Sequence, residues 1–110
     1  MKLFIIDWSK DSTTALIDYC SGTPHKVVGR ELADGGEAYK KTGKCSPDAI
    51  IINYSVKPAH GRQAAESIRQ RKHTAEIPIY FIDGSEEDNE MVSHYGICLS
   101  QEELQDLLEN

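Results

Sequence analysis

The chain has 110 residues, 39% of them hydrophobic, which gives room for one domain with its own core and is too apolar for a disordered tail. Its 12 basic and 18 acidic residues give a net charge of −6, which argues against nucleic acid or an anionic membrane surface as a partner. No apolar run approaches the roughly eighteen residues that a membrane span needs. The apolar stretch after Met1 is also too short for a secretory signal. We therefore expect one cytoplasmic domain over 1–110, with no separate output domain.

Five apolar runs predict the strands of the fold. The three that stand out, at 3–6, 49–52 and 77–82, are continuous rather than alternating, which is typical of strands covered on both faces by helices. In chain order the five runs are Leu3–Ile6, a weaker run around Val27-Val28, Ala49–Ile52, Ile77–Ile82 and Gly96–Leu99.

The segments between these runs have helical spacing of apolar residues. They are Ser12–Cys20, 33–41, Gly61–Lys72, a segment that begins at Ser85, and a last one that begins at Ser100. The alternation of strand and helix predicts an open parallel α/β sheet with helices on both faces.

Local start signals support two of the helices. Ser100 with Glu103 has the spacing of a capping box, and Ser85 with Asp88 resembles one. The helix over 33–41 has the weakest support, because a glycine pair lies inside it or just before it.

One stretch of the chain carries a recognisable pattern. Its elements are Pro47-Asp48 before an aliphatic run, Asn53 at the end of that run, Gly61 eight residues later, Ile68-Arg69, and Ile77-Pro78-Ile79 at the next run. In these residues the chain resembles a CheY-like receiver domain of two-component signalling. The resemblance implies a doubly wound (βα)5, flavodoxin-like sheet with strand order 2-1-3-4-5, and a place in a phosphorelay.

The residues that carry receiver chemistry are mostly replaced. The resemblance implies an acid pair after the first strand, a phosphate-accepting aspartate after the third, a hydroxyl after the fourth and a lysine after the fifth. Here Asp7 keeps one acid, Trp8 replaces the other, Asn53 replaces the nucleophile and Asp83 replaces the hydroxyl, and no lysine follows Gly96–Leu99. An amide cannot form an acyl phosphate. We therefore expect a pseudo-receiver that is not an enzyme and acts by binding protein.

Two of the replaced positions have structural interpretations as well. Trp8 is expected to place its ring at the mouth of the pocket, or to pack against Pro58 or the loop near Ser55. Asn53 is expected to hydrogen-bond within its own loop.

An alternative function follows from the implied strand order. It brings Asp7, Asn53 and Asp83 together at the carboxyl edge of the sheet, where their oxygens could hold Mg²⁺ or Ca²⁺. The domain would then sense a metal or a small ligand through Asp7 and Asp83. Alternatively, both carboxylates are solvated and one of them caps the helix that begins at Ser85.

The resemblance also implies a partner face, formed by the fourth helix, fifth strand and fifth helix. Its candidate residues are Met91, Val92, Tyr95, Ile97 and Leu108. A protein partner or a second copy of the chain would bind there.

A basic cluster occurs near the end of the third helix. It comprises Arg69, Arg71, Lys72 and His73. We expect it to be solvated and to complement the negative end of the helix dipole.

Overall fold

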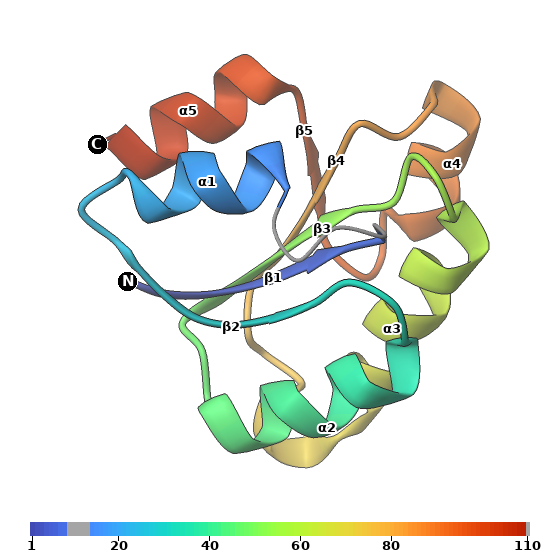
Figure 1. Cartoon of the computed structure of the whole chain (residues 1–110). Helices are drawn as coiled ribbons and strands as arrows, with labels where there is room; N and C mark the ends of the chain where they lie inside the picture. The colour runs from blue at the N-terminus through green and yellow to red at the C-terminus, as the bar shows by residue number, and fades with distance from the viewer. Residues whose placement is uncertain (9–13, 110) are drawn as a thin grey trace.

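The computed structural model describes residues 1–8 and 14–109 and confirms the predicted fold (Figure 1). The strands form one five-stranded sheet in the order β2-β1-β3-β4-β5, and every paired neighbour is parallel. The strands are β1 (Lys2–Asp7), β2 (Lys26–Glu31), β3 (Ala49–Asn53), β4 (Ile79–Ile82) and β5 (Ile97–Leu99).

One helix follows each strand, as the alternation predicted. The helices are α1 (Ala15–Ser21), α2 (Gly35–Cys45), α3 (Pro58–Gln70), α4 (Glu86–Val92) and α5 (Gln101–Glu109), with a short 3-10 turn at Lys72–Thr74. Positions 12 and 13 of the predicted first helix lie outside the described residues. In the described part of the chain, no helix is long and apolar enough to cross a bilayer.

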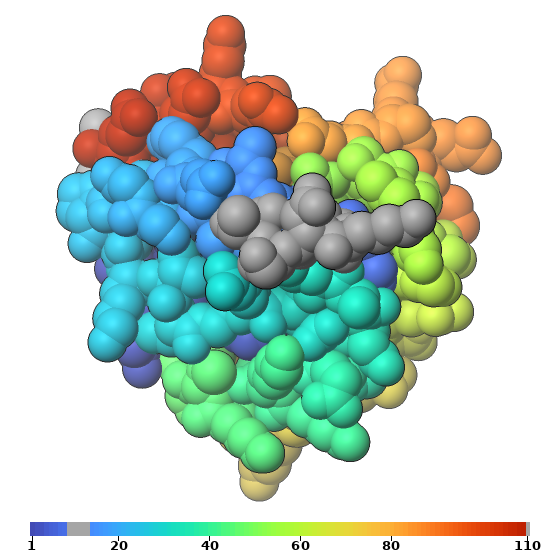
Figure 2. Space-filling view, viewed as in Figure 1, coloured from blue at the N-terminus to red at the C-terminus, as the bar shows by residue number. Residues whose placement is uncertain are grey.

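The helices form two layers, one on each face of the sheet (Figure 1). Alternate strand residues point to opposite faces, so each continuous apolar run supplies both layers. Leu3, Ile5 and Ile51 pack with α1 and α5, whereas Phe4 and Ile50 pack on the side of α2, α3 and α4. Figure 2 shows α1 and α5 side by side on the surface.

Capping defines the helix starts. The Ser100–Glu103 box is complete, because each residue's side chain accepts the other's backbone N–H, at 3.1 Å and 3.0 Å. The second helix begins later than predicted, since the Asp34 side chain accepts the N–H of Gly36 and places the glycine pair in the first turn. Ser85 caps α4 through Asp88 N–H at 3.1 Å.

The expectation that the whole basic cluster is solvated is wrong, because its two arginines make contacts within the protein. Arg69 donates to the backbone oxygens of Tyr95, at 2.7 Å, and Ala75, at 2.9 Å. Arg71 lies over the Tyr39 ring at 4.0 Å and donates to Thr42 Oγ1 at 2.9 Å. These two arginines therefore link α3 to its neighbours. Lys72 and His73 are exposed.

Candidate functional site at the carboxyl edge of the sheet

Three polar residues meet where the central strands end. Asp7 ends β1 and lies opposite Asn53, the last residue of β3. Asp83 follows β4 with a left-handed φ of 61°, a conformation that aspartate tolerates better than most residues. Asn53 Nδ2 donates to Asp83 Oδ2 at 3.0 Å. The predicted juxtaposition at the topological switch point is therefore present.

Asn53 also hydrogen-bonds within its own loop, as predicted. Its Oδ1 accepts the Ser55 backbone N–H at 3.1 Å and the Ser55 hydroxyl at 2.9 Å. A backbone N–H can only donate, so this contact fixes the amide oxygen toward the loop and the amide nitrogen toward Asp83. The oxygen that a cation would need is turned away from the acids.

Asp83 is exposed and is held by side-chain amides. Besides Asn53, Gln101 donates through Nε2 to Oδ1 at 3.2 Å and to Oδ2 at 3.4 Å. The interpretation of Asp83 as the cap of α4 is wrong, because Ser85 occupies that position. Sequence reasoning missed Gln101, although its place at the start of α5, directly after β5, puts it at the same sheet edge.

Asp7 is a buried carboxyl, with 8% of its surface exposed. Burial raises its pKa, a hydrogen bond from the Thr14 side chain opposes this effect, and the negative charge of Asp83 raises the pKa further. Thr14 also caps α1 by accepting the Ile17 N–H at 3.2 Å. Thr14 is therefore both the N-cap of α1 and a hydrogen-bond donor to the Asp7 carboxyl.

A cavity of about 310 Å³ opens from this edge between α1 and α5. Its polar end contains the three residues from the strand ends, and its sides are mostly apolar. The lining residues are Asp7, Ala15, Leu16, Tyr19, Asn53, Ile82, Asp83, Gln101, Leu104 and Gln105.

Trp8 does not lie at the mouth of this cavity, contrary to one of the two expectations. It follows Asp7, so its side chain points to the opposite face of the sheet, where it is buried with Phe4 and Ile6. Its ring packs at 6.0 Å from the His60 ring of α3. The alternative expectation named Pro58 or the loop near Ser55, and it stays a prediction, since the ring contact is with His60.

Two carboxylates, those of Asp7 and Asp83, are too few for most Ca²⁺ sites, which take six to eight oxygen ligands. Mg²⁺ keeps several of its waters and uses only one or two carboxylates, so a Mg²⁺ site on these two acids stays a prediction. Across residues 1–8 and 14–109, no group of three or more His, Cys, Asp or Glu side chains could hold a metal ion. Asp7 and Asp83 are the two acids of the cavity, and the Asn53 oxygen is already bound.

The predicted partner face is only partly exposed. Met91 and Ile97 are exposed, at 46% and 57%, and Tyr95 is half-buried against the core. Val92 and Leu108 are buried, with 1% exposure each, because both side chains pack toward the sheet. These two side chains are therefore not available for contact with a partner.

A second hollow, of about 650 Å³, lies between α2 and α3 and was not predicted. Asp34, Tyr39, His60 and Gln63 are among its lining residues. None of the described residues that line it stands at the end of a strand. No sequence pattern pointed to it.

The comparisons with known proteins agree with this architecture. No family model matches the chain, and no curated protein matches its sequence. Solved structures do match. The receiver domain of a sensor histidine kinase from Pseudomonas aeruginosa PAO1, solved with magnesium in its active-site cleft, is 20% identical with a TM-score of 0.76, over 97% of this chain and 93% of that one.

Two further structures give the same result. The signal receiver domain of a modulated diguanylate cyclase from Desulfovibrio desulfuricans G20 is 18% identical, with a TM-score of 0.72, over 97% of this chain and 86% of that one. The response regulator domain of Thermotoga maritima CheB is 22% identical, with a TM-score of 0.69, over 89% and 75%. At these identities the likeness concerns the fold, and the fold of this chain is that of the CheY-like receiver domains.

Proposed function

We propose that the chain is a pseudo-receiver in signal transduction, which is not phosphorylated on an aspartate and acts by binding another protein. The observation that carries this proposal is Asn53. It stands at the phosphate-accepting position, with its oxygen bound to Ser55 and its nitrogen bound to Asp83.

The surroundings of Asn53 also disfavour phosphoryl transfer. Asp83 would repel an incoming phosphoryl group, where a hydroxyl would hydrogen-bond to it. The described residues that line the cavity include neither lysine nor arginine. We further propose that the domain has no enzymatic activity, since the described site offers acids without a group that stabilises an electrophile.

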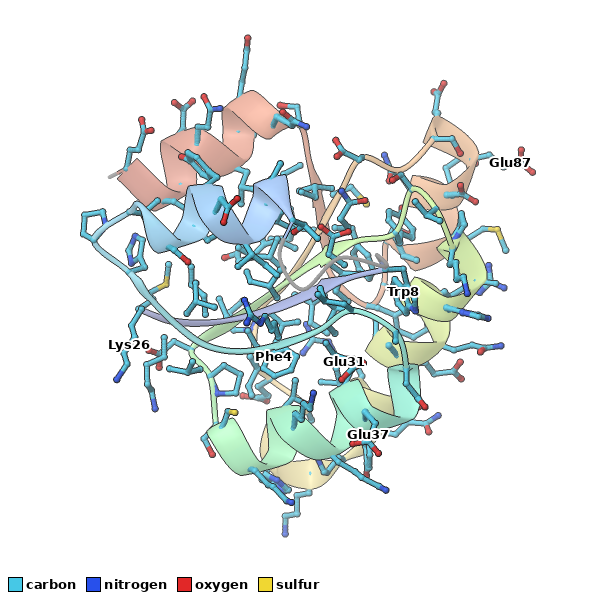
Figure 3. All side chains as sticks on the ribbon, in the orientation of Figure 1. Phe4, Trp8, Lys26, Glu31, Glu37 and Glu87 are labelled. Atoms are coloured by element: carbon cyan, nitrogen blue, oxygen red, sulfur yellow. The ribbon has the colours of Figure 1, made fainter. Side chains whose placement is uncertain are left out.

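The exposed part of α4 and β5 suits a basic partner. Met91 and Ile97 provide apolar anchors, and Met side chains adapt well to a binding surface. Glu86 and Glu90 line a hollow of about 500 Å³ next to them. Glu87 projects outward from the same helix (Figure 3). Two such acidic faces would repel each other, which favours a basic partner over a second copy.

Phosphorylation is the first test. Purified protein incubated with acetyl phosphate and Mg²⁺ should show no phosphoryl adduct by intact-mass spectrometry, and neither should Asn53→Asp. The variant gains a carboxylate but keeps Asp83 in place of the hydroxyl, and no lysine is among the described residues of the cavity. A phosphorylatable receiver treated in parallel controls for the reagent. An adduct on the wild-type protein would refute the proposal, and one on Asn53→Asp would refute our picture of the site.

Partner binding is the second test. A photo-crosslinking residue placed at Ile97 should capture a specific protein in the cells that make this chain, and Met91→Lys should abolish the capture. The matched control places the same residue at Val56, which is also exposed and apolar, at 70%, but lies outside this face. Equal capture from both positions would argue against the α4–β5 face.

A further inference from the structure

The cavity between α1 and α5 combines two kinds of surface. Its walls are hydrocarbon from Ala15, Leu16, Ile82 and Leu104, and all but Ala15 belong to the buried core. Burial of an alkyl group against such walls is favourable in proportion to the apolar area that it covers. The walls alone would therefore accept a short hydrocarbon chain.

The polar end of the cavity contains two carboxylates that have no cationic partner among the described residues. Asp7 receives a hydroxyl hydrogen bond from Thr14, and Asp83 receives only neutral amide donors. Neither carboxylate takes part in an ion pair within the described residues, where the ion pairs join α2 lysines to Glu31 and Glu37. The buried Asp7 carboxylate is costly to ionise without a cation, whereas the exposed Asp83 carboxylate is solvated.

These features select among ligands. Phosphate and other anions would be repelled by both acids. A divalent metal ion would find the two carboxylates but not the Asn53 oxygen, and it would leave the apolar walls uncovered. A neutral alkyl compound would leave the carboxylates unpaired. The ligand that matches both the acids and the apolar walls is an organic cation with a hydrocarbon stem and several N–H donors.

We propose that this cavity binds a primary alkylammonium group, with the ammonium between Asp7 and Asp83 and the stem between α1 and α5. An ammonium has three donors and forms charge-assisted hydrogen bonds with carboxylates. Gln101 is a positioning residue, since its amide holds the Asp83 carboxylate from the α5 side. The site is separate from the α4–β5 face and does not depend on the partner proposed for it.

The same group can come from a free amine or from a lysine side chain of another protein. The test therefore titrates ¹⁵N-labelled protein with n-butylammonium and with Nα-acetyl-lysine amide, followed by NMR. Saturable shifts should concentrate on the amides of 82–84 and 101–105. Butan-1-ol, the matched neutral probe, should give none at the same concentrations.

Two variants test whether the Asp83 carboxylate binds the ammonium group. Asp83→Asn keeps an acceptable residue at the left-handed φ and should weaken n-butylammonium binding about tenfold, as expected for loss of one charge-assisted contact. Glu102→Gln, an exposed acid of α5 outside the cavity, should bind like wild type. A well-dispersed spectrum of each variant shows that it is folded.

Each result has a consequence. Binding of n-butylammonium alone identifies a free amine as the ligand, and equal or tighter binding of the lysine derivative identifies a protein lysine. Equal shifts with butan-1-ol, undiminished binding to Asp83→Asn, or no saturable shifts with either amine would overturn the proposal. If the protein proved to be phosphorylated, the pseudo-receiver proposal would fail, but the amine titrations of the unphosphorylated protein would keep their meaning. The two proposals are therefore tested independently.

Discussion

At the scale of single residues, Asp7 is a carboxylic acid at a position where burial disfavours its negative charge. The residue ends a strand whose other interior side chains are apolar, and only 8% of its surface reaches solvent. Its negative charge is disfavoured by burial and by the nearby charge of Asp83, and the hydrogen bond from Thr14 compensates in part. Retaining a carboxylate there lowers stability at neutral pH.

This cost has a measurable pH dependence. The pKa of Asp7 is raised above its ordinary value of 3.8, so the folded chain holds the proton more tightly than the unfolded chain. The stability that this proton gives is present below 3.8 and is lost as the pH rises through the raised pKa. Asp7→Asn removes the loss, and we expect it to stabilise the protein by about 0.5–1 kcal/mol at neutral pH, with no gain near pH 3.

The measurement is urea denaturation of both proteins across this pH range, with the slope checked for constancy. Glu102→Gln is the control, because it removes the charge of an acid that is exposed to solvent instead of buried. A lower stability of Asp7→Asn at neutral pH would mean that the carboxylate makes interactions that the amide cannot replace.

At the scale of elements, the strands, their order and the strand-end residues could be predicted from the sequence. Continuous aliphatic runs and the receiver pattern carry that information, and Asp7, Asn53 and Asp83 indeed meet at one edge. Side-chain direction was harder to predict. In a continuous apolar run both faces look alike, so the side to which Trp8 points follows only from counting alternate residues from Leu3.

Tertiary contacts account for the remaining surprises. Gly61 was noticed for its spacing, but its reason is steric, since a Cβ there would clash with the buried Tyr54 side chain. Tyr54 in turn donates to Asn89 of α4. The inward direction of Val92 and Leu108 depends on how α4 and α5 dock on the sheet, and a single sequence does not contain that angle.

At the scale of the whole molecule, the sheet separates two apolar layers and also connects them. The layer under α2, α3 and α4 contains Trp8, whereas the layer under α1 and α5 contains the walls of the cavity between these two helices. Neighbouring strand residues belong to different layers but share one backbone ladder. Loss of packing in either layer should therefore loosen the hydrogen bonds that support the other.

This connection predicts a single cooperative unfolding transition, which a matched pair of variants can test. Ile50→Val and Ile51→Val each remove one buried methylene group, from opposite faces of β3, and each should cost about 0.5–1.5 kcal/mol. Trp8 is the only tryptophan, so its fluorescence reports on one layer, whereas circular dichroism reports on the whole backbone. Both probes should give the same midpoint for both variants, because a domain of this size unfolds as one unit. If Ile51→Val lowers the circular dichroism midpoint but leaves that of Trp8 fluorescence unchanged, the α1–α5 layer unfolds separately, and ligand binding in its cavity would stabilise only that half of the protein.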